Sequence, residues 1–515
     1  MGRCLVGCSW LVGILLIAAC PATPEDRPQW GQRYTRNMFS GERNLPANFD
    51  PVAGINIKWK ARLGSETYST PVIGGGRVII GTNNRQPRDA RHSGDRSIFA
   101  CFNESDGSFL WQLVCPKLTN SIYWDWPNAG MCSTATIEGR RVYLVGNRGE
   151  VMCLDLDGMA NGNDGPFKDE DSHSVPAGSP PIPAGTHDAD ILWLFDYIKE
   201  CGVRQHDQAH ASPLVHGRFL YVNTSNGVDD SHRKIMAPDA PSLIVLDKET
   251  GRLVAQDAER IGPRIFHSTW SSPALGDMNG RPVIIFAGGD GIIYGFEPVS
   301  ELPPQGTVLK LKKLWWFDFD PDAPKENVHQ YNSNRKISPS NIKSMPVFHQ
   351  GRVYVTGGGD VWWGKNEAWL KCFKVAGSGN ITDTAILWSY PLERHTMSTP
   401  AVHDGLVYVA DCGRKIHCVD AQTGNAVWVH EAQGDIWASP LVADGKVYIG
   451  TRRGELIILA AGREKKVLAT VEMDSPIHPS PVAANGVLYV ATMRYLYAIS
   501  QSATPSNAPT NNQGQ

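Results

Sequence analysis

Apolar and polar residues alternate in short runs along most of the chain, and glycine-containing turns separate these runs. In the clearest copy, STPAVHDGLVYV from Ser398, a His-Asp-Gly turn joins two apolar runs. This pattern is typical of two antiparallel strands connected by a tight turn. Similar stretches begin at Ser69, Ser133, Ser212, Ser272, Ser344, Ser398, Ser439 and Ser480. The sequence therefore predicts eight copies of one β unit.

Each copy continues into two further strands. After Ser398 these are KIHCVD and AVWVH, and the turn between them ends at Gly424, where glycine can supply the positive φ of a bulged hairpin. Trp428 follows this glycine by four residues, and Gly107 and Trp111 repeat the offset. The last two copies follow at intervals of 40 and 41 residues. Four antiparallel strands at this interval predict blades stacked around an axis.

The two ends of the repeat region complement each other. The last copy stops at YLYAIS and is followed by a polar tail, 501–515, instead of a fourth strand. An isolated strand at 55–64, which contains Trp59, precedes the first copy. Its pairing with the last blade would leave neither blade with an open edge. We therefore predict an all-β fold, an eight-bladed β-propeller of four-stranded antiparallel blades over 55–500, closed by the N-terminal strand.

The segment VYV…DAQTGNAVW, within 407–428, resembles the pyrroloquinoline-quinone-like propeller repeat, including its tryptophan-docking motif. The resemblance covers Ile55 to Ser500 and implies the same eight-bladed fold. The family includes quinone-dependent dehydrogenases and cofactor-free scaffolds, among them the lipoprotein of the bacterial outer-membrane barrel-assembly machinery. The long insertions also resemble those of large propeller proteins of planctomycete-type bacteria. The resemblance therefore specifies the fold and leaves the function open.

The first twenty residues have the features of an export signal. One arginine precedes an apolar run from Trp10 to Ala19, which is too short for a membrane-spanning helix. The run ends at Ile-Ala-Ala-Cys, which resembles a bacterial lipobox, so we expect a signal peptide over 1–20 and a lipid on Cys20. An ordinary signal peptide is the alternative. Residues 21–54 would be a tether and lead-in, and the protein would lie in the cell envelope, in the periplasm or outside, with the identity of the membrane left open.

Charge and cysteine content describe the expected environment. A formal net charge of −3 over 515 residues provides no basic surface for nucleic acid. Beyond the leader the chain has eight cysteines, an even number that fits an oxidising compartment. Those within apolar strands, such as Cys101 and Cys153, suit buried thiols equally well. We expect a monomer that contacts the membrane only through its lipid and does not bind nucleic acid.

Long insertions distinguish the copies from one another. Turns between the first and second strands are short in all eight copies, whereas most of the extra length falls in the turns and connections that meet at the opposite end of a propeller. The long segments are 83–96, 117–131, 198–210, 227–242, 320–343 and 358–369. Loops of this kind deepen the mouth of the central channel, where ligands of propellers bind.

Aromatic residues are frequent in these insertions and just before the inner strands. The residues that should surround the channel mouth are Tyr68, Met131, His210, Trp270, Lys343, Met397, Trp437 and His478. The predicted binding face consists of Tyr123, Trp124, Trp126, His210, Trp270, Trp362, Trp363, Lys365, Trp437 and His478. Such side chains supply contact area for a ligand, and the alternative is that they only pack their loops onto the blades.

Two segments contain residue types that bind metal ions. In HDQAH, 206–210, the two histidines have a spacing that forms a metal pair on a helix, but a strand follows, so no metal is expected there. An exceptional insertion at 155–171 carries oxygen ligands on a glycine-rich loop, as calcium prefers. These ligands are Asp155, Asp157, Asn161, Asn163 and Asp164. The loop does not follow the EF-hand pattern, and Asx-rich loops are often stable without a metal.

The sequence favours a binding protein over an enzyme. Quinone-dependent dehydrogenases, by resemblance, use a disulfide between adjacent cysteines, calcium and a catalytic aspartate, and this chain has no Cys-Cys pair. We therefore assign no catalytic or cofactor-binding residue, and we expect neither quinone nor any cofactor other than calcium. The predicted function is an exported, lipid-anchored scaffold that binds a protein or polymer at its loop-rich end. A quinone- and calcium-dependent dehydrogenase and a carbohydrate- or polymer-binding propeller remain the alternatives.

Overall fold

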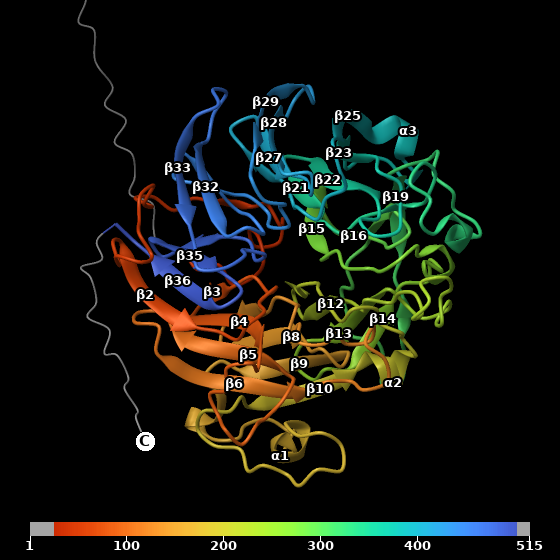
Figure 1. The fold of residues 1–515 in the computed structure, drawn as a ribbon. Coiled ribbons are helices and arrows are strands. Elements are labelled where there is room, and N and C mark those ends of the chain that lie inside the picture. The colour runs from red at the N-terminus through yellow and green to blue at the C-terminus, as the bar shows by residue number, and fades with distance from the viewer. Residues whose placement is uncertain (1–24, 502–515) are drawn as a thin grey trace, which may run out of the picture.

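Residues 25–501, which the computed structural model describes, form eight sheets arranged in a ring (Figure 1). The predicted eight-bladed propeller is confirmed. The expected signal peptide, Cys20 and the tail beyond 501 lie outside the described residues. Within 25–501, no helix has the length and apolar character needed to cross a membrane.

The first four blades follow the chain order from the inner to the outer strand. Blade 1 contains β3 (Val72–Gly74), β4 (Arg77–Asn83), β5 (Arg96–Asn103) and β6 (Phe109–Pro116). Blade 2 contains β7 (Thr136–Glu138), β8 (Arg141–Val145), β9 (Glu150–Asp155) and β10 (Ile191–Asp196). Blade 3 contains β11 (Leu214–His216), β12 (Phe219–Asn223), β13 (Leu243–Asp247), β14 (Leu253–Gln256) and β18 (Leu309–Lys310). Blade 4 contains β15 (Ala274–Met278), β16 (Arg281–Ala287), β17 (Ile292–Phe296), β19 (Lys313–Asp318) and β24 (Gly379–Asn380).

The remaining blades close the ring. Blade 5 contains β20 (Ser340–Asn341), β21 (Val347–His349), β22 (Arg352–Gly359), β23 (Ala368–Lys374) and β25 (Ile386–Leu392). Blade 6 contains β26 (Ala401–His403), β27 (Leu406–Ala410), β28 (Lys415–Asp420) and β29 (Ala426–Glu431). Blade 7 contains β1 (Phe39–Ser40), β30 (Leu441–Ala443), β31 (Lys446–Gly450), β32 (Glu455–Ala460) and β33 (Val467–Glu472). Blade 8 contains β34 (Val482–Ala484), β35 (Val487–Ala491), β36 (Tyr495–Ile499) and β2 (Ile57–Arg62), which pairs antiparallel with β36.

Short helices occur only in the connections of the described chain. They are α1 (Glu170–His173), α2 (Tyr197–Cys201) and α3 (Thr382–Ala385), with 3₁₀ turns η1 (Gly158–Asn161), η2 (Gly262–Arg264) and η3 (Val328–Tyr331). The eight cysteines within 25–501 are free thiols. The second and third strands of each blade are buried on both faces between neighbouring blades, which explains their nearly continuous apolar runs.

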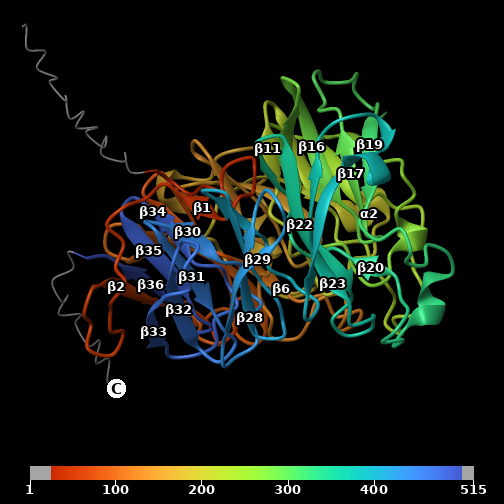
Figure 2. The same ribbon diagram turned by 90° about the horizontal axis from the view of Figure 1, so that it is seen from above.

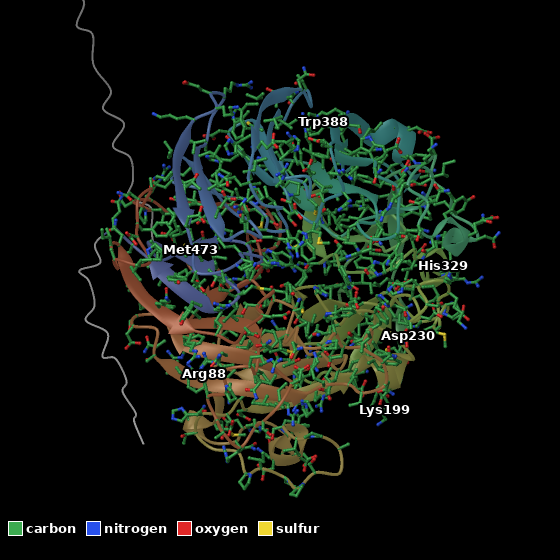
Figure 3. All side chains as sticks on the ribbon, in the orientation of Figure 1. Arg88, Lys199, Asp230, His329, Trp388 and Met473 are labelled. Atoms are coloured by element: carbon green, nitrogen blue, oxygen red, sulfur yellow. The ribbon has the colours of Figure 1, made fainter. Side chains whose placement is uncertain are left out.

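Tryptophans of the outer strands connect neighbouring blades. Each places its indole against the third-to-fourth-strand turn of the following blade and donates Nε1–H to a backbone carbonyl there, over 2.9–3.1 Å. These residues are Trp59, Trp111, Trp193, Trp388 and Trp428. Trp388 lies at the outer part of the ring (Figure 3) and packs on Gly424 of blade 6. Gly107, Gly251 and Gly424 each receive the tryptophan of the preceding blade in this way.

The segment 25–54, expected as a tether and lead-in, is packed on the propeller instead. Residues 27–42, here called the strap, contact the inner region of all eight blades in turn. The strap begins with Arg27, whose carbonyl accepts the N–H of Ile73 in blade 1. It ends with Glu42, whose carboxylate accepts the N–H groups of Asn485 and Gly486 in blade 8. The polar composition of the strap resembles that of a linker, but its polar groups form hydrogen bonds with backbone groups of the inner strands that would otherwise be unpaired.

We expect Gly424→Ala to destabilise the protein. A Cβ at this position would lie 2.7 Å from the Trp388 ring, and φ is +74°. The matched control is Gly486→Ala, which has φ +75° and no described atom within 4 Å of the added Cβ. Both variants should lose about 1 kcal/mol through the left-handed backbone, and only Gly424→Ala should lose a further ~1–3 kcal/mol through overpacking. Thermal unfolding of both variants measures the difference, and equal melting temperatures would contradict the docking role of Gly424.

Candidate functional site

A cavity of about 370 Å³ opens at the channel mouth. It is bounded by the starts of the inner strands and by the long insertions, and Trp30 of the strap contributes to its wall. Of the eight residues predicted to surround the channel mouth, all except Met131 line the cavity. Met131 is fully buried, and its neighbours Ala129 and Cys132 line the cavity instead.

All but two residues of the predicted binding face line the cavity. The residues that line the cavity are Tyr123, Trp126, His210, Trp270, Trp362, Trp363, Trp437 and His478. Trp124 instead lies under the guanidinium group of Arg204, 4.0 Å from ring centroid to Cζ. Lys365 is buried, and its Nζ lies 2.6 Å from a carboxylate oxygen of Asp320. Sequence alone could not show that Lys365 compensates the buried carboxylate of Asp320.

Aromatic rings form a continuous band around the cavity. The indole of Trp362 meets those of Trp270 and Trp437 edge to face, with centroids 6.0 and 6.2 Å apart. His478 contacts Trp437 and Tyr68, each with a centroid distance of 5.1 Å. Edge-to-face contacts of this kind stabilise aromatic pairs. The band leaves a cavity surface that suits a planar or ring-shaped group.

Asp360 connects this band to the histidines of the cavity wall. Its Oδ1 accepts the backbone N–H groups of Trp362 and Trp363, over 3.0 and 3.1 Å. Its Oδ2 lies 2.9 Å from Nδ1 of His267 and 3.1 Å from Nζ of Lys343. Burial alone would raise the pKa of Asp360, but Lys343 and His267 outweigh burial and hold this pKa well below its usual range. One buried anion therefore orients four neighbouring residues.

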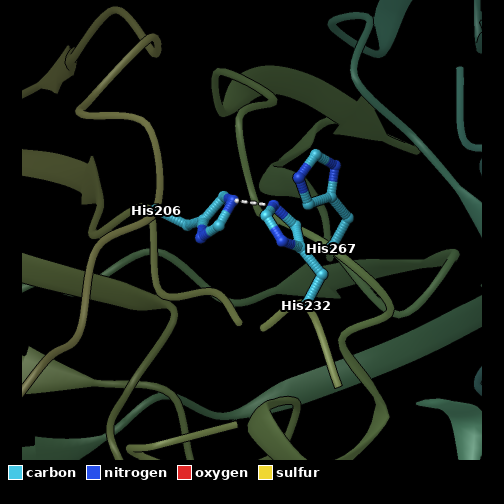
Figure 4. A group of neighbouring side chains, drawn as sticks. All are labelled: His206, His232 and His267. Atoms are coloured by element: carbon cyan, nitrogen blue, oxygen red, sulfur yellow. Dashed lines mark hydrogen bonds between the residues drawn. The ribbon is translucent and has the colours of Figure 1, made fainter. Parts of the chain in front are cut away.

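His206, His232 and His267 form a cluster in the wall of the cavity (Figure 4). One ring nitrogen from each histidine lies within 4.8 Å of a ring nitrogen of each of the other two. The three side chains are therefore close enough together to bind one metal ion. Burial, together with the neighbouring histidines, lowers the pKa of His206 well below its usual value and that of His232 to about 4. His206 and His232 are therefore neutral at neutral pH. Asp207 lies beside them, with Oδ2 3.7 Å from Nε2 of His206.

Three connections between strands carry these histidines, and two of the connections have an unusual backbone conformation. His206 and Asp207 precede β11, His232 lies between β12 and β13, and His267 precedes β15. The backbone is left-handed at Asp207 (φ +56°), Gln208 (φ +73°) and His232 (φ +57°). Non-glycine residues in this region store strain, which functional sites frequently contain. The N–H of Asp207 donates to the carbonyl of Tyr123, whose ring stacks on His206.

Sequence reasoning missed this cluster. The HDQAH spacing pairs His206 with His210, but in the structure Nε2 of His210 lies 2.9 Å from the Asp207 carbonyl and its ring lies beside Trp270. His206 instead meets His232 and His267 from other insertions. No spacing rule connects residues in three separate loops, so nothing in the sequence could identify the group.

The loop expected as a calcium site is stabilised by cationic side chains of the chain itself. Asp157 pairs with Arg77 at 2.9 Å and with Arg140. The Lys168 ammonium donates to the backbone carbonyl and side-chain oxygen of Asn163 and to the carbonyl of Asp164 at 3.0 Å. A calcium ion would have to displace these cations. Calcium at this loop remains a prediction that its contacts do not favour.

Comparison with known proteins supports the repeat type. The family model described as "Outer membrane protein assembly factor BamB" matches residues 374–465. Quinohemoprotein alcohol dehydrogenase of Comamonas testosteroni is 34% identical over 103 residues, 18% of this chain and 14% of the enzyme. A 1-butanol dehydrogenase (cytochrome c) of Thauera butanivorans is 28% identical over 101 residues, 17% of this chain and 15% of the enzyme. The chain thus matches only about a seventh of the length of these relatives.

Two solved structures share the fold over most of the chain. The crystal structure of BamB from Moraxella catarrhalis has a TM-score of 0.52 at 12% identity and covers 86% of this chain and 97% of that one. A europium-containing methanol dehydrogenase has a TM-score of 0.50 at 11% identity and covers 91% and 90%. These similarities establish the architecture and do not choose between a scaffold and an enzyme.

Asp360→Asn is expected to weaken the whole site. The substitution removes the charge that compensates Lys343 in a buried position, which costs about 3–5 kcal/mol of the free energy of unfolding. The matched control is Asp435→Asn, because Asp435 is half-exposed and its partner Arg452 is 3.8 Å away, so the loss there should be below about 1 kcal/mol. Thermal unfolding compares the two variants. Similar small losses would show that Asp360 does not organise the cavity wall.

Proposed function

Because the chain is a β-propeller of the pyrroloquinoline-quinone-like repeat type, we propose that it is a binding module of the cell envelope. It holds a protein or polymer partner at the end where the long insertions gather. The observation that carries this proposal is the aromatic cavity of about 370 Å³ at the channel mouth. Ligand sites typically have such volumes, a mainly apolar lining and a few placed polar groups.

The cavity suits an anchoring role. Trp270, Trp362 and Trp437 offer indole surface to a planar or ring-shaped group of the partner. Lys343 and Asp207 supply polar groups within its lining. The surrounding insertions would add contact area, with Trp126, 43% exposed, at the rim. Buried aromatic anchors surrounded by weaker contacts are typical of binding hot spots.

The location in the envelope rests on the N-terminal sequence. The apolar run before Cys20 has the features of an export signal with a lipobox. We propose that lipidation of Cys20 attaches the propeller to a membrane and that the strap begins soon after this anchor. Two or more acyl chains are sufficient for stable attachment.

Site-specific photo-crosslinking in the native envelope tests the binding role. A benzophenone amino acid at Trp126 should give a discrete adduct. The same probe at Asp404, 84% exposed in a first-to-second-strand turn at the opposite end, should give none. In the Trp126-probe background, Trp437→Ala should reduce the yield about tenfold or more, since loss of a hot-spot aromatic costs ~2 kcal/mol or more. Equal adducts from both ends, or a yield that Trp437→Ala does not change, would contradict the proposal.

Quinone-dependent oxidation is the second candidate, and the local similarity to two dehydrogenases favours it. The absence of adjacent cysteines in the sequence opposes it. Purified protein incubated with pyrroloquinoline quinone and calcium, then desalted, should retain the quinone chromophore and reduce a dye with alcohols if this function holds. Loss of the chromophore on desalting would leave the binding role.

A further inference from the structure

The three histidines of the cavity wall direct ring nitrogens at one another (Figure 4). Nε2 of His206 lies 3.1 Å from Nε2 of His232. The ring of His267 completes the group, with centroids 4.8 Å from His206 and 5.3 Å from His232. All three side chains are at least nine-tenths buried. Such a grouping in a protein interior requires an explanation, because polar atoms there normally have partners.

The hydrogen bonds on the far side of each ring define the tautomers. Nδ1 of His206 lies 2.9 Å from the carbonyl of Val228, and Nδ1 of His267 lies 2.9 Å from the carboxylate of Asp360. The His232 ring has the carbonyl of Asp230 as its other partner. Each of these oxygens can only accept, so each takes an N–H from its ring. A neutral imidazole then has an unprotonated Nε2.

With these tautomers the facing Nε2 atoms of His206 and His232 are both acceptors, so neither donates a proton to the other. Two such nitrogens at 3.1 Å repel each other, and Nε2 of His267 has no hydrogen-bond partner among the described residues. A metal ion between them removes both defects. Tetrahedral zinc with Zn–N distances of about 2.0–2.1 Å places two nitrogens about 3.3 Å apart, close to the separation found here.

The outer contacts match those of a metal centre. Metal-bound histidines usually donate their second N–H to a carboxylate or a backbone carbonyl, which fixes the ring and raises its basicity. His267 has the carboxylate of Asp360, and the other two rings have carbonyls. The Tyr123 ring stacks on His206 and meets His232 edge-on, which restricts both rings further.

Two other groupings in the described chain lack these features. Cys115, Glu150 and His173 lie close together, but Arg148 neutralises Glu150 at 2.9 Å. Asp89, His92 and Asp188 also meet, but Arg91 pairs with Asp89 at 2.6 Å and lies 3.7 Å from Asp188. In both, a guanidinium group already occupies the place of a cation.

We propose that His206, His232 and His267 bind a divalent transition-metal ion of the zinc class through their Nε2 atoms. This inference goes beyond the proposed binding role and stands without it. Three histidine ligands leave at least one coordination position for water or an oxygen ligand. His232, His267 and Asp207 line the cavity, so that position is accessible to a ligand that enters it.

Asp207 gives the centre a polar neighbour. Its Oδ1 is buried without a hydrogen-bond partner among the described residues, and its Oδ2 lies 3.7 Å from Nε2 of His206. The carboxylate can accept a proton from a metal-bound water or bind the ion directly as a fourth ligand. A hydroxyl or carboxylate group of the partner would reach the metal from the same cavity.

Metal titration of the full chain tests the inference. The protein is treated with a chelator, desalted and titrated with Co²⁺, whose visible absorption reports the ligand set. One equivalent should give an intense band that Zn²⁺ then removes. His267→Gln and His232→Gln should abolish the band. Asp360→Asn should weaken Co²⁺ binding about 10- to 100-fold, because it alters the carboxylate that accepts the Nδ1–H of His267. The matched control, His430→Gln, changes a half-buried histidine of β29 away from the cavity and should leave the band intact.

Folding of each variant is checked by circular dichroism. If the cluster variants do not fold, the wild-type spectrum and the metal content of the purified protein decide. Absence of a Co²⁺ band and of stoichiometric metal in the wild-type protein would overturn the inference, as would a band that persists in folded His267→Gln. Loss of metal without loss of the crosslink at Trp126 would leave the proposed binding role in place.

Discussion

The buried guanidinium group of Arg36 holds the strap in the central channel. It donates five hydrogen bonds, to the carbonyls of Trp30, Ser212, Pro213 and Pro273 and to the hydroxyl of Ser212. Burial lowers the pKa of Arg36 to about 9. The inner strands of a closed ring present unpaired backbone groups to the channel, and the planar fork of arginine satisfies several of them at once. The cost of burying the charge is offset only because every N–H group in that fork is used.

Closure of the channel by the strap determines where chemistry can occur. Trp30, in the strap, contributes to the wall of the cavity at the opposite end, so strap and cavity are parts of one assembly. Insertions from several blades then complete the site, and Asp360 fixes His267, Lys343 and the Trp362–Trp363 turn relative to one another. At right angles to the view of Figure 1, the green and cyan part of the chain with β16, β19 and β20 lies at one side of the molecule (Figure 2). In this arrangement the rigid ring of blades provides stability, and the variable loops provide the residues for recognition.

Local sequence patterns predicted the blades. The docking partners, the strap and the histidine cluster depend on contacts between residues far apart in the sequence, and local patterns could not predict them. The Gly424–Trp428 offset identified the docking motif, but the partner of Gly424 is Trp388 of the preceding blade, because an outer strand contacts its neighbour and not its own turn. The strap resembled a linker because its partners are backbone groups far along the chain. The channel-mouth residues other than Met131 were predictable, since each precedes an inner strand. The histidine cluster was not, because its members come from three loops without a common period.

Hydrogen–deuterium exchange of the full chain tests the central claim most directly. If the strap closes the channel, the amides that donate to it, such as those of Ile73, Leu275 and Phe348, exchange as slowly as those of the middle strands. Peptides spanning 27–42 should be protected as well. Exchange of the strap peptides within seconds, at the rate of an unstructured chain, would contradict a closed channel and with it the assignment of all recognition to one end.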